Sequence, residues 1–242
     1  LKIPANWKLA GQIGLFLFLT SILYEFVNFK IHMMNYESED TVIAHLINIF
    51  INSALNSSFS GFFCMVVFAG IDKMYQKSFP QLISFKNIIS FKSFTTKTYF
   101  NSYIIGITAS LIFIAFSGIF YYLIDQSKYY ISYIQLDHNA ILTNPLLSII
   151  LSTIINGLPT ILTFSMITLI IFHATKNKWL TILIVSIIHS FAYFHEFNYI
   201  VVEPLFLKNI YYSIFAFIGS YLLLNYGIIS LSSVVISTFL IL

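Results

Sequence analysis

The chain has 242 residues, of which 58% are hydrophobic and only 9% are charged, and its mean hydropathy is +0.86. Soluble domains carry about 25% charged residues, so this composition excludes the soluble enzyme classes and indicates that most of the chain is solvated by lipid. All 12 basic residues are lysines and the net charge is only +3, which gives no indication of nucleic-acid binding and excludes any site that needs the bidentate fork of an arginine.

Long apolar windows dominate the sequence. A helix needs roughly 20 apolar residues to cross the hydrocarbon core of a bilayer. Seven windows near that length contain almost no charge, and they cover residues 9–27, 42–71, 99–124, 144–173, 179–197, 209–224 and 228–242. The sequence therefore predicts an all-α, polytopic membrane bundle of about seven transmembrane helices.

The lysines predict how this bundle is oriented, because short cytoplasmic loops carry an excess of basic residues. Nine of the 12 lysines lie before the first window, after the second or after the fourth. The alternate loops hold most of the acidic residues, namely Glu37, Glu39, Asp40, Asp125, Asp137, Glu196 and Glu203. We therefore expect a cytoplasmic N-terminus.

The segment between the second and third windows is too polar to cross a membrane. Apolar residues recur in it at helical spacing from Leu82 to Ile89, and Lys86 and Lys92 accompany them. This pattern predicts a basic interfacial helix whose two lysines contact anionic headgroups; an ordinary basic loop is the alternative. The expected organisation is one integrated membrane domain with N-terminal transmembrane helices, a cytoplasmic basic segment and a transmembrane core, in residues 1–71, 72–98 and 99–242 respectively.

Two of the windows carry polar residues at steps of three or four, which is helical spacing. Polar groups inside a bilayer are costly unless they face protein or water, so each stripe is expected to face the interior of the bundle. Such stripes either hydrogen-bond neighbouring helices or line a path. They comprise His45, Asn48, Asn52 and Asn56 in the second window, and Ser148, Ser152, Asn156 and Thr163 in the fourth.

The fifth window contains the ionisable residues of greatest interest, His189, His195 and Glu196. At about 100° per residue, His189, Tyr193 and Glu196 share one helix face while His195 points away. The spacing of the histidines does not match the zinc-protease pattern, in which the second histidine follows the first by four residues. His189 is therefore either a functional intramembrane group or a structural histidine bonded to a neighbouring helix.

Signatures of soluble enzymes are absent from the sequence. It contains no Gly-x-Ser-x-Gly motif, no phosphate-binding glycine loop and no carboxylate cluster at EF-hand spacing. The single cysteine, Cys64, excludes an internal disulfide and a cysteine-based metal site. We therefore expect neither a metal nor a cofactor.

Several short motifs follow one another in an informative order. They are Phe68-Ala69-Gly70, Ile141-Leu142-Thr143-Asn144-Pro145, Lys178-Trp179-Leu180 and Tyr221-Leu222-Leu223-Leu224-Asn225-Tyr226-Gly227. This order, over about two-thirds of the chain, resembles the longer members of the CPBP family, the intramembrane proteases of the CAAX-protease and bacteriocin-processing group. The resemblance implies a bundle of helices around a membrane-embedded catalytic site.

The resemblance also implies where catalytic groups would lie. The family uses a Glu-Glu-x-x-x-Arg motif, a Phe-x-x-x-His motif and a later histidine. Counted from Trp179, these positions fall in this chain on Pro159, Thr160, Phe164, Tyr193 and Val235. A slip of two residues brings His195 onto the second motif. Because both carboxylates and the arginine are missing, the chain resembles a degenerate member without the groups that activate water.

Three functional hypotheses follow. The first is a catalytically inactive scaffold or subunit that binds another membrane protein or a peptide. The second is a transporter or channel subunit lined by the polar stripes. The third is an intramembrane peptidase with a non-standard site, in which His189 or His195 acts with Glu196 or Glu25. The bias towards Lys, Ile, Asn, Phe and Tyr suggests an A+T-rich bacterial genome, and hence the plasma membrane.

Overall fold

A computed structural model describes residues 6–34, 36, 41–82, 91–126, 131–133, 144–192, 200–202 and 205–241. The helices in these ranges are α1 (Trp7–Val27), α2 (Phe29–Met34), α3 (Val42–Ser78), α5 (Phe91–Phe94), α6 (Lys97–Gln126), α8 (Pro145–Thr175), α9 (Lys178–Ala192), α10 (Leu205–Tyr226) and α11 (Ile228–Ile241). Two short strands, β1 (Ile131–Tyr133) and β2 (Ile200–Val202), pair antiparallel. The described chain is therefore helical apart from this ribbon.

Five of the helices, α1, α3, α6, α8 and α10, are long and apolar enough to cross a membrane. This is the pattern of an integral membrane protein. Each of the seven predicted windows contains a helix, but α9 and α11 have only 15 and 14 residues. Five spans are therefore supported by helix length, and the count of seven stays a prediction.

Local capping explains where the helices begin. The side chain of Asn144 accepts a hydrogen bond from the Leu147 N–H at 3.2 Å, and Pro145 occupies the first helical position. Thr41 caps α3 in the same way, with its hydroxyl oxygen 3.2 Å from the Ala44 nitrogen. These side chains satisfy N–H groups that have no partner within the helix, so the starts of α8 and α3 lie within a residue of the predicted windows.

The helix α3 is longer than predicted. It continues through Ser78, so the expected boundary at residue 72, between the transmembrane helices and the cytoplasmic segment, lies inside a helix. The reason is that Asp72 accepts a hydrogen bond from the Gln76 amide one turn later, at 2.9 Å, which favours helix in this polar stretch. Residues 83–90, including Lys86, lie outside the described residues, so the predicted interfacial helix from Leu82 to Ile89 stays a prediction. The short helix α5, which follows that stretch, includes Lys92.

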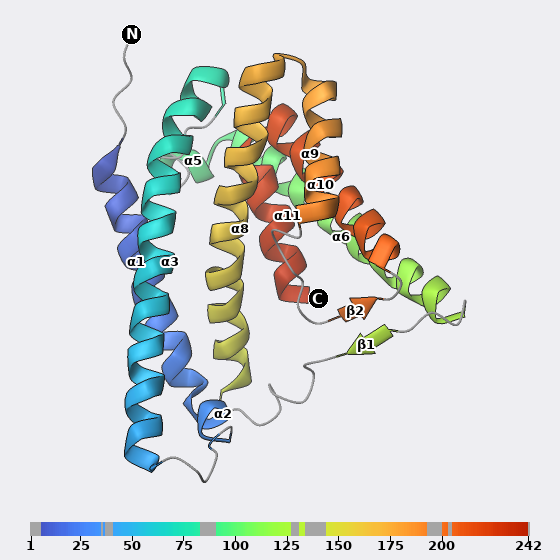
Figure 1. Cartoon of the computed structure of the whole chain (residues 1–242). Helices are drawn as coiled ribbons and strands as arrows, with labels where there is room; N and C mark the ends of the chain where they lie inside the picture. The colour runs from blue at the N-terminus through green and yellow to red at the C-terminus, as the bar shows by residue number, and fades with distance from the viewer. Residues whose placement is uncertain are drawn as a thin grey trace.

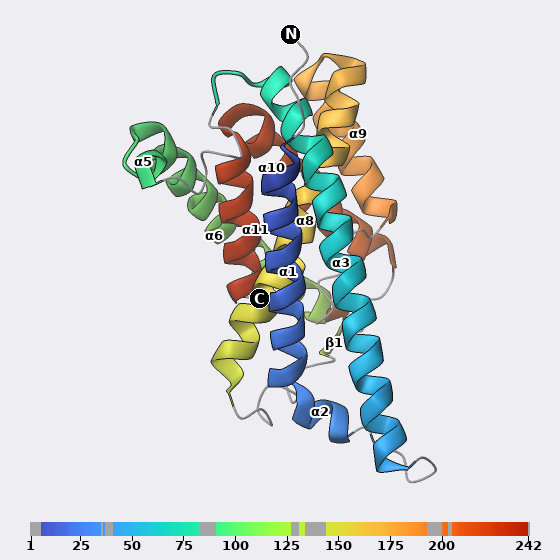
Figure 2. The same cartoon turned by 90° about the vertical axis from the view of Figure 1, so that its left-hand side faces the viewer.

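The long helices alternate in direction (Figures 1 and 2). From the end of the molecule that holds the N-terminus, α1 runs away, α3 returns, α6 descends obliquely and α8 returns. The pattern continues with α9 descending, α10 returning and α11 descending to the C-terminus. As a result, the carboxyl ends of α3 and α8 lie at the same end of the molecule as the start of α1.

Close backbone contacts hold the helices together. A Cβ atom on Gly14 would lie 2.6 Å from the carbonyl oxygen of Gly61, and a Cβ atom on Gly61 would lie 2.7 Å from that of Gly14. A Cβ atom on Gly106 would likewise lie 2.5 Å from the carbonyl oxygen of Ser230 and 2.6 Å from the Cβ atom of Ser233. The pairs α1–α3 and α6–α11 therefore pack through small residues, as membrane helices commonly do.

The turn between α10 and α11 is fixed by side chains of other helices. Gly227 adopts a positive φ of 87°, which a residue with a side chain rarely adopts. The Tyr75 hydroxyl of α3 accepts a hydrogen bond from the Ile228 N–H at 3.2 Å. The Ser102 hydroxyl of α6 donates to the Tyr226 carbonyl at 3.1 Å. Helices α3 and α6 thus position the start of α11.

The glycine contact between α1 and α3 yields a stability prediction. Gly14→Ala adds a Cβ atom 2.6 Å from the Gly61 carbonyl oxygen, and we expect it to destabilise the protein by roughly 1–3 kcal/mol because a backbone atom cannot move aside cheaply. Gly11→Ala, in the same helix with nothing within 4 Å, is the control and should be neutral or slightly stabilising. Thermal unfolding in detergent measures the stability of both variants. Equal unfolding midpoints for Gly14→Ala and Gly11→Ala would contradict the close contact between α1 and α3.

Candidate functional site

A groove of about 690 Å³ opens between α1, α6, α8 and α11, four helices that can be followed in Figure 2. Its volume lies within the range of roughly 300–1,000 Å³ that is usual for ligand pockets. The lining residues are Leu9, Gln12, Ile13, Phe16, Phe68, Tyr99, Tyr103, Leu158, Ile161, Leu162, Ile228, Ile229, Ser232, Ser233, Ile236, Ser237 and Leu240. This groove is the candidate functional site.

The groove is chemically suited to an apolar occupant. Aliphatic and aromatic side chains supply most of its described lining, and none of those lining residues is charged. The polar groups are Gln12, two tyrosines and three serines. One of these serines, Ser233, donates its hydroxyl to the Ile229 carbonyl of its own helix at 2.8 Å. An apolar wall with a few neutral polar groups favours a hydrophobic segment over an ionic ligand.

Helix packing keeps the groove open. The helix α1 makes its main contacts with α3 and α8, whereas α11 packs on α6, α8 and α10. The Gly14–Gly61 contact binds α1 to α3, and the Gly106 contact binds α11 to α6. Ile161 and Leu162 of α8, both buried, lie between these two pairs and line the groove as well. The two walls share α8, but α1 is otherwise held by α3 and α11 by α6 and α10.

The positions to which the family resemblance assigns catalytic groups lie in the packed core. Thr160 and Phe164 of α8 and Val235 of α11 are buried, and Pro159 is half-buried. The Thr160 hydroxyl donates to the carbonyl of Asn156 in its own helix at 2.6 Å. A Cβ atom on Gly157 would lie 4.0 Å from the Cγ1 atom of Val235, so α8 and α11 face each other near these positions. None of these four side chains can act as a general acid or base at neutral pH.

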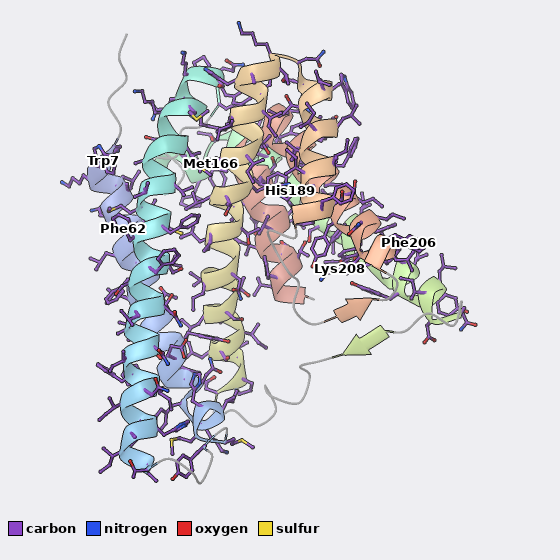
Figure 3. The ribbon with its side chains drawn as sticks, viewed as in Figure 1. Trp7, Phe62, Met166, His189, Phe206 and Lys208 are labelled. Carbon is purple, nitrogen blue, oxygen red and sulfur yellow. The ribbon has the colours of Figure 1, made fainter. Side chains whose placement is uncertain are left out.

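His189 is a buried residue of α9 (Figure 3). Its Nδ1 atom donates to the carbonyl oxygen of Val185 at 3.1 Å. Its ring lies against Phe164, with the ring centroids 4.7 Å apart. The hydrogen bond is within α9, and the contact with the neighbouring helix α8 is the ring packing on Phe164. Tyr193, His195 and Glu196 lie outside the described residues, and within the described ranges no group of three His, Cys, Asp or Glu residues could hold a metal ion.

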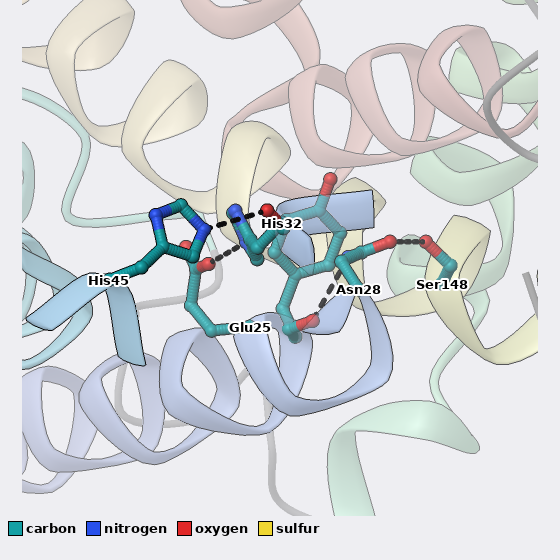
Figure 4. Close-up of polar contacts among 6 residues, drawn as sticks. Glu25, Asn28, His32, His45 and Ser148 are labelled. Carbon is teal, nitrogen blue, oxygen red and sulfur yellow. Dashed lines mark hydrogen bonds and ion pairs between the residues drawn. The ribbon is translucent and has the colours of Figure 1, made fainter. Parts of the chain in front are cut away.

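A polar cluster joins four helices at the end of the bundle opposite the N-terminus (Figure 4). The Glu25 carboxylate lies 2.7 Å from the Nε2 atom of His32, which belongs to α2. His45, at the start of α3, donates from Nε2 to the His32 carbonyl at 3.2 Å. Ser148 of α8 donates to the Asn28 side-chain oxygen at 3.1 Å. The cluster therefore ties the end of α1 to α2, α3 and α8.

Sequence reasoning found only part of this cluster. His45 and Ser148 belong to the predicted polar stripes, and both contact another helix. Asn28 and His32 were missed because they follow the first apolar window, where polar residues are ordinary. Asn28 follows Glu25 by three residues and His32 follows Asn28 by four. This helical spacing was the sequence signal that could have indicated that the three side chains lie together.

The α3 stripe requires a correction. Asn48, Asn52 and Asn56 are exposed on the outside of the described bundle, so the prediction that they face its interior does not hold. The side of α3 that carries small residues, including Gly61 and Cys64, faces inwards because small residues allow α1 to approach closely. At about 100° per residue this packing turns the asparagines outwards.

The α8 stripe is also less interhelical than predicted. Ser148 is buried and bonds to another helix, but Asn156 is exposed. Ser152 and Thr163 are half-buried and donate their hydroxyls to carbonyl groups of their own helix, those of Ile149 and Pro159. Most of this stripe is therefore satisfied locally, as serine and threonine often are in membrane helices.

Comparisons of the chain with protein-family models, with curated proteins and with solved structures found no match. The resemblance to the CPBP family accordingly rests on the order of short motifs in the sequence and stays a hypothesis.

The polar cluster yields a second prediction. Asn28→Ala removes the acceptor of the Ser148 hydroxyl, and we expect a loss of about 1–2 kcal/mol because Ser148 is buried and would be left without that bond. His32→Ala is the matched control in the same cluster. It removes a partly exposed ion pair, which should contribute less than about 1 kcal/mol. Thermal unfolding in detergent compares the two variants. A larger loss of stability in His32→Ala than in Asn28→Ala would contradict this prediction.

Proposed function

We propose that the chain is a catalytically inactive, CPBP-like membrane protein that acts as a scaffold or subunit, and that it binds an apolar segment of another membrane protein or peptide in the groove between α1 and α11. The observation that carries this proposal is the groove itself, with its volume of about 690 Å³ and its uncharged, largely apolar described lining. The groove has the size of a binding site and the surface chemistry of a site for a hydrophobic ligand.

The polar groups of the groove suit a peptide segment. Ser232 and Ser237 lie along the α11 wall, where hydroxyls can hydrogen-bond a partner within the bilayer. Gln12 and Tyr99 lie near the starts of α1 and α6, at the end of the bundle that holds the N-terminus. Tyrosine is common at membrane interfaces. An apolar segment running along α11 would thus meet neutral polar partners along its length and near one end.

The absence of catalytic groups from the expected positions supports binding over chemistry. Water attack by general-base catalysis needs a positioned group of suitable pKa. Pro159, Thr160, Phe164 and Val235 supply none at the positions given by the resemblance. The described lining of the groove also lacks carboxylate and imidazole groups. A binding role therefore fits the groove better than a peptidase role.

The proposed topology has a cytoplasmic N-terminus and seven crossings, with α9 and α11 as short spans, in a bacterial plasma membrane. The lysine distribution supports it, because the carboxyl ends of α3 and α8, after which basic segments follow in the sequence, lie at the same end as the start of α1. The Lys178 ammonium group also donates a hydrogen bond to the Asn225 side-chain oxygen at 3.0 Å. Beside it, the rings of Trp179 and Tyr221 lie with their centroids 6.2 Å apart. Aromatic residues beside lysine are typical of an interface. Lys86 and Lys92 are proposed to contact anionic headgroups there.

The transporter hypothesis loses its main support. It required the two polar stripes to line a common path. Asn48, Asn52 and Asn56 instead lie on the outer side of α3, and Asn156 of α8 is exposed. The hypothesis of a non-standard His/Glu site gains no support either, because His195 and Glu196 lie outside the described chain and His189 is packed against Phe164.

Site-specific photo-cross-linking tests the groove. A photoreactive residue at Ile236, which lines the groove, should capture a discrete protein or peptide in native membranes. The same residue at Ile112, a 62% exposed position of α6 outside the groove, should yield only lipid adducts. Ser232→Trp, which fills the groove, should abolish capture at position 236. Lipid adducts alone at both positions, or capture unaffected by Ser232→Trp, would contradict the proposal.

A further inference from the structure

The outer face of α3 carries three amides that no other helix among the described residues covers. Asn48, Asn52 and Asn56 follow one another at steps of four, which keeps them within an arc of about 80°. The Asn52 amide nitrogen donates to the Asn48 side-chain oxygen at 2.9 Å. Within the described part of the chain, no other hydrogen bond reaches these three amides. In both views α3 lies at the edge of the bundle (Figures 1 and 2).

Two of these amides lie at the depth of the hydrocarbon core. The 21 residues of α1 span about 31 Å, which matches a core of about 30 Å. Helices α1 and α3 run antiparallel and touch at Gly14 and Gly61. Counting along both helices from this contact puts Asn56 within about 3 Å, and Asn52 within about 9 Å, of the level of Leu17 at the middle of α1. Amides so placed cannot reach water.

An amide exposed to lipid is unfavourable, so a polar partner within the membrane is required. Asparagine supplies two N–H donors and one carbonyl acceptor, and it is therefore complementary to another asparagine. A face made of asparagines fits a second copy of itself in a two-fold interface, the commonest symmetry of protein assemblies. Buried asparagines fix partner and register in helix pairs in the same way.

The remainder of the face also suits helix packing. Phe59 and Phe63 follow the asparagines on the same side of α3, and their rings stack with centroids 6.5 Å apart and planes 17° apart. Phe59 is 73% exposed. The face is separate from the groove, to which α3 contributes only Phe68 among the described lining residues.

We propose that two copies of this chain associate in the membrane through α3, with Asn52 and Asn56 hydrogen-bonded between the copies. Because both copies have the same orientation in the bilayer, the two-fold axis lies along the membrane normal and the α3 helices run parallel. The interface forms independently of the groove, so the dimer is a feature beyond the proposed binding function.

Disulfide cross-linking tests this interface. Background cross-linking is easy to remove, because Cys64 is the only cysteine in the sequence and is buried. In a Cys64→Ala background, Phe59→Cys should give a disulfide-linked dimer when membranes are oxidised. Phe50→Cys is the matched control, since Phe50 is 68% exposed but lies on nearly the opposite side of α3. Equal cross-linking at both positions would overturn the proposal, and so would a Phe59→Cys adduct with a different protein and no dimer.

The role of the amides is tested in the same background. Asn52→Leu combined with Asn56→Leu should lower the yield of the Phe59→Cys dimer by about tenfold, because the interhelical hydrogen bonds are lost. Asn156→Leu, which alters an exposed asparagine of α8, should leave the yield unchanged. Thermal unfolding of the monomer should not change in either variant. A yield that does not respond to the α3 substitutions, or that responds equally to Asn156→Leu, would overturn the proposal.

Discussion

Apolar side chains gain little by meeting one another inside a bilayer, so the distance to which two helix backbones can approach decides which helices pair. In this protein the backbones approach closely where Gly14 meets Gly61 and where Gly106 meets Ser230. These contacts pair α1 with α3 and α11 with α6. The groove between α1 and α11 and the outward face of α3 both follow from these two pairings, because a helix that is packed on one side leaves its other side open.

The distribution of polar groups is less informative about function than the sequence suggests. Many buried hydroxyls, such as those of Thr160 and Ser220, donate to carbonyls of their own helix. A smaller number join different helices, among them Ser148 with Asn28 and Ser117 with Tyr211 at 2.9 Å. The first kind allows a serine or threonine to be buried in an apolar environment at little cost. Only the second kind fixes the positions of helices.

The positions of the helices could be predicted because hydropathy and capping are local properties, as Asn144 and Pro145 illustrate. The end of α3 was missed because Asp72 and Gln76 look like loop residues until their hydrogen bond is seen. The direction of the asparagine stripe was also missed, although Gly61 marked the opposite face as the side for close packing. The groove could not be predicted, since its walls come from helices more than 200 residues apart in sequence.

The length of α3 has a mechanical consequence. Its 37 residues extend over about 55 Å, well beyond the thickness of a hydrocarbon core of about 30 Å. One continuous helix therefore carries the His45 contact near one end and the Tyr75 contact near the other. The Gly14–Gly61 contact lies between these two contacts, so a tilt of the whole helix about it would move the two ends in opposite directions.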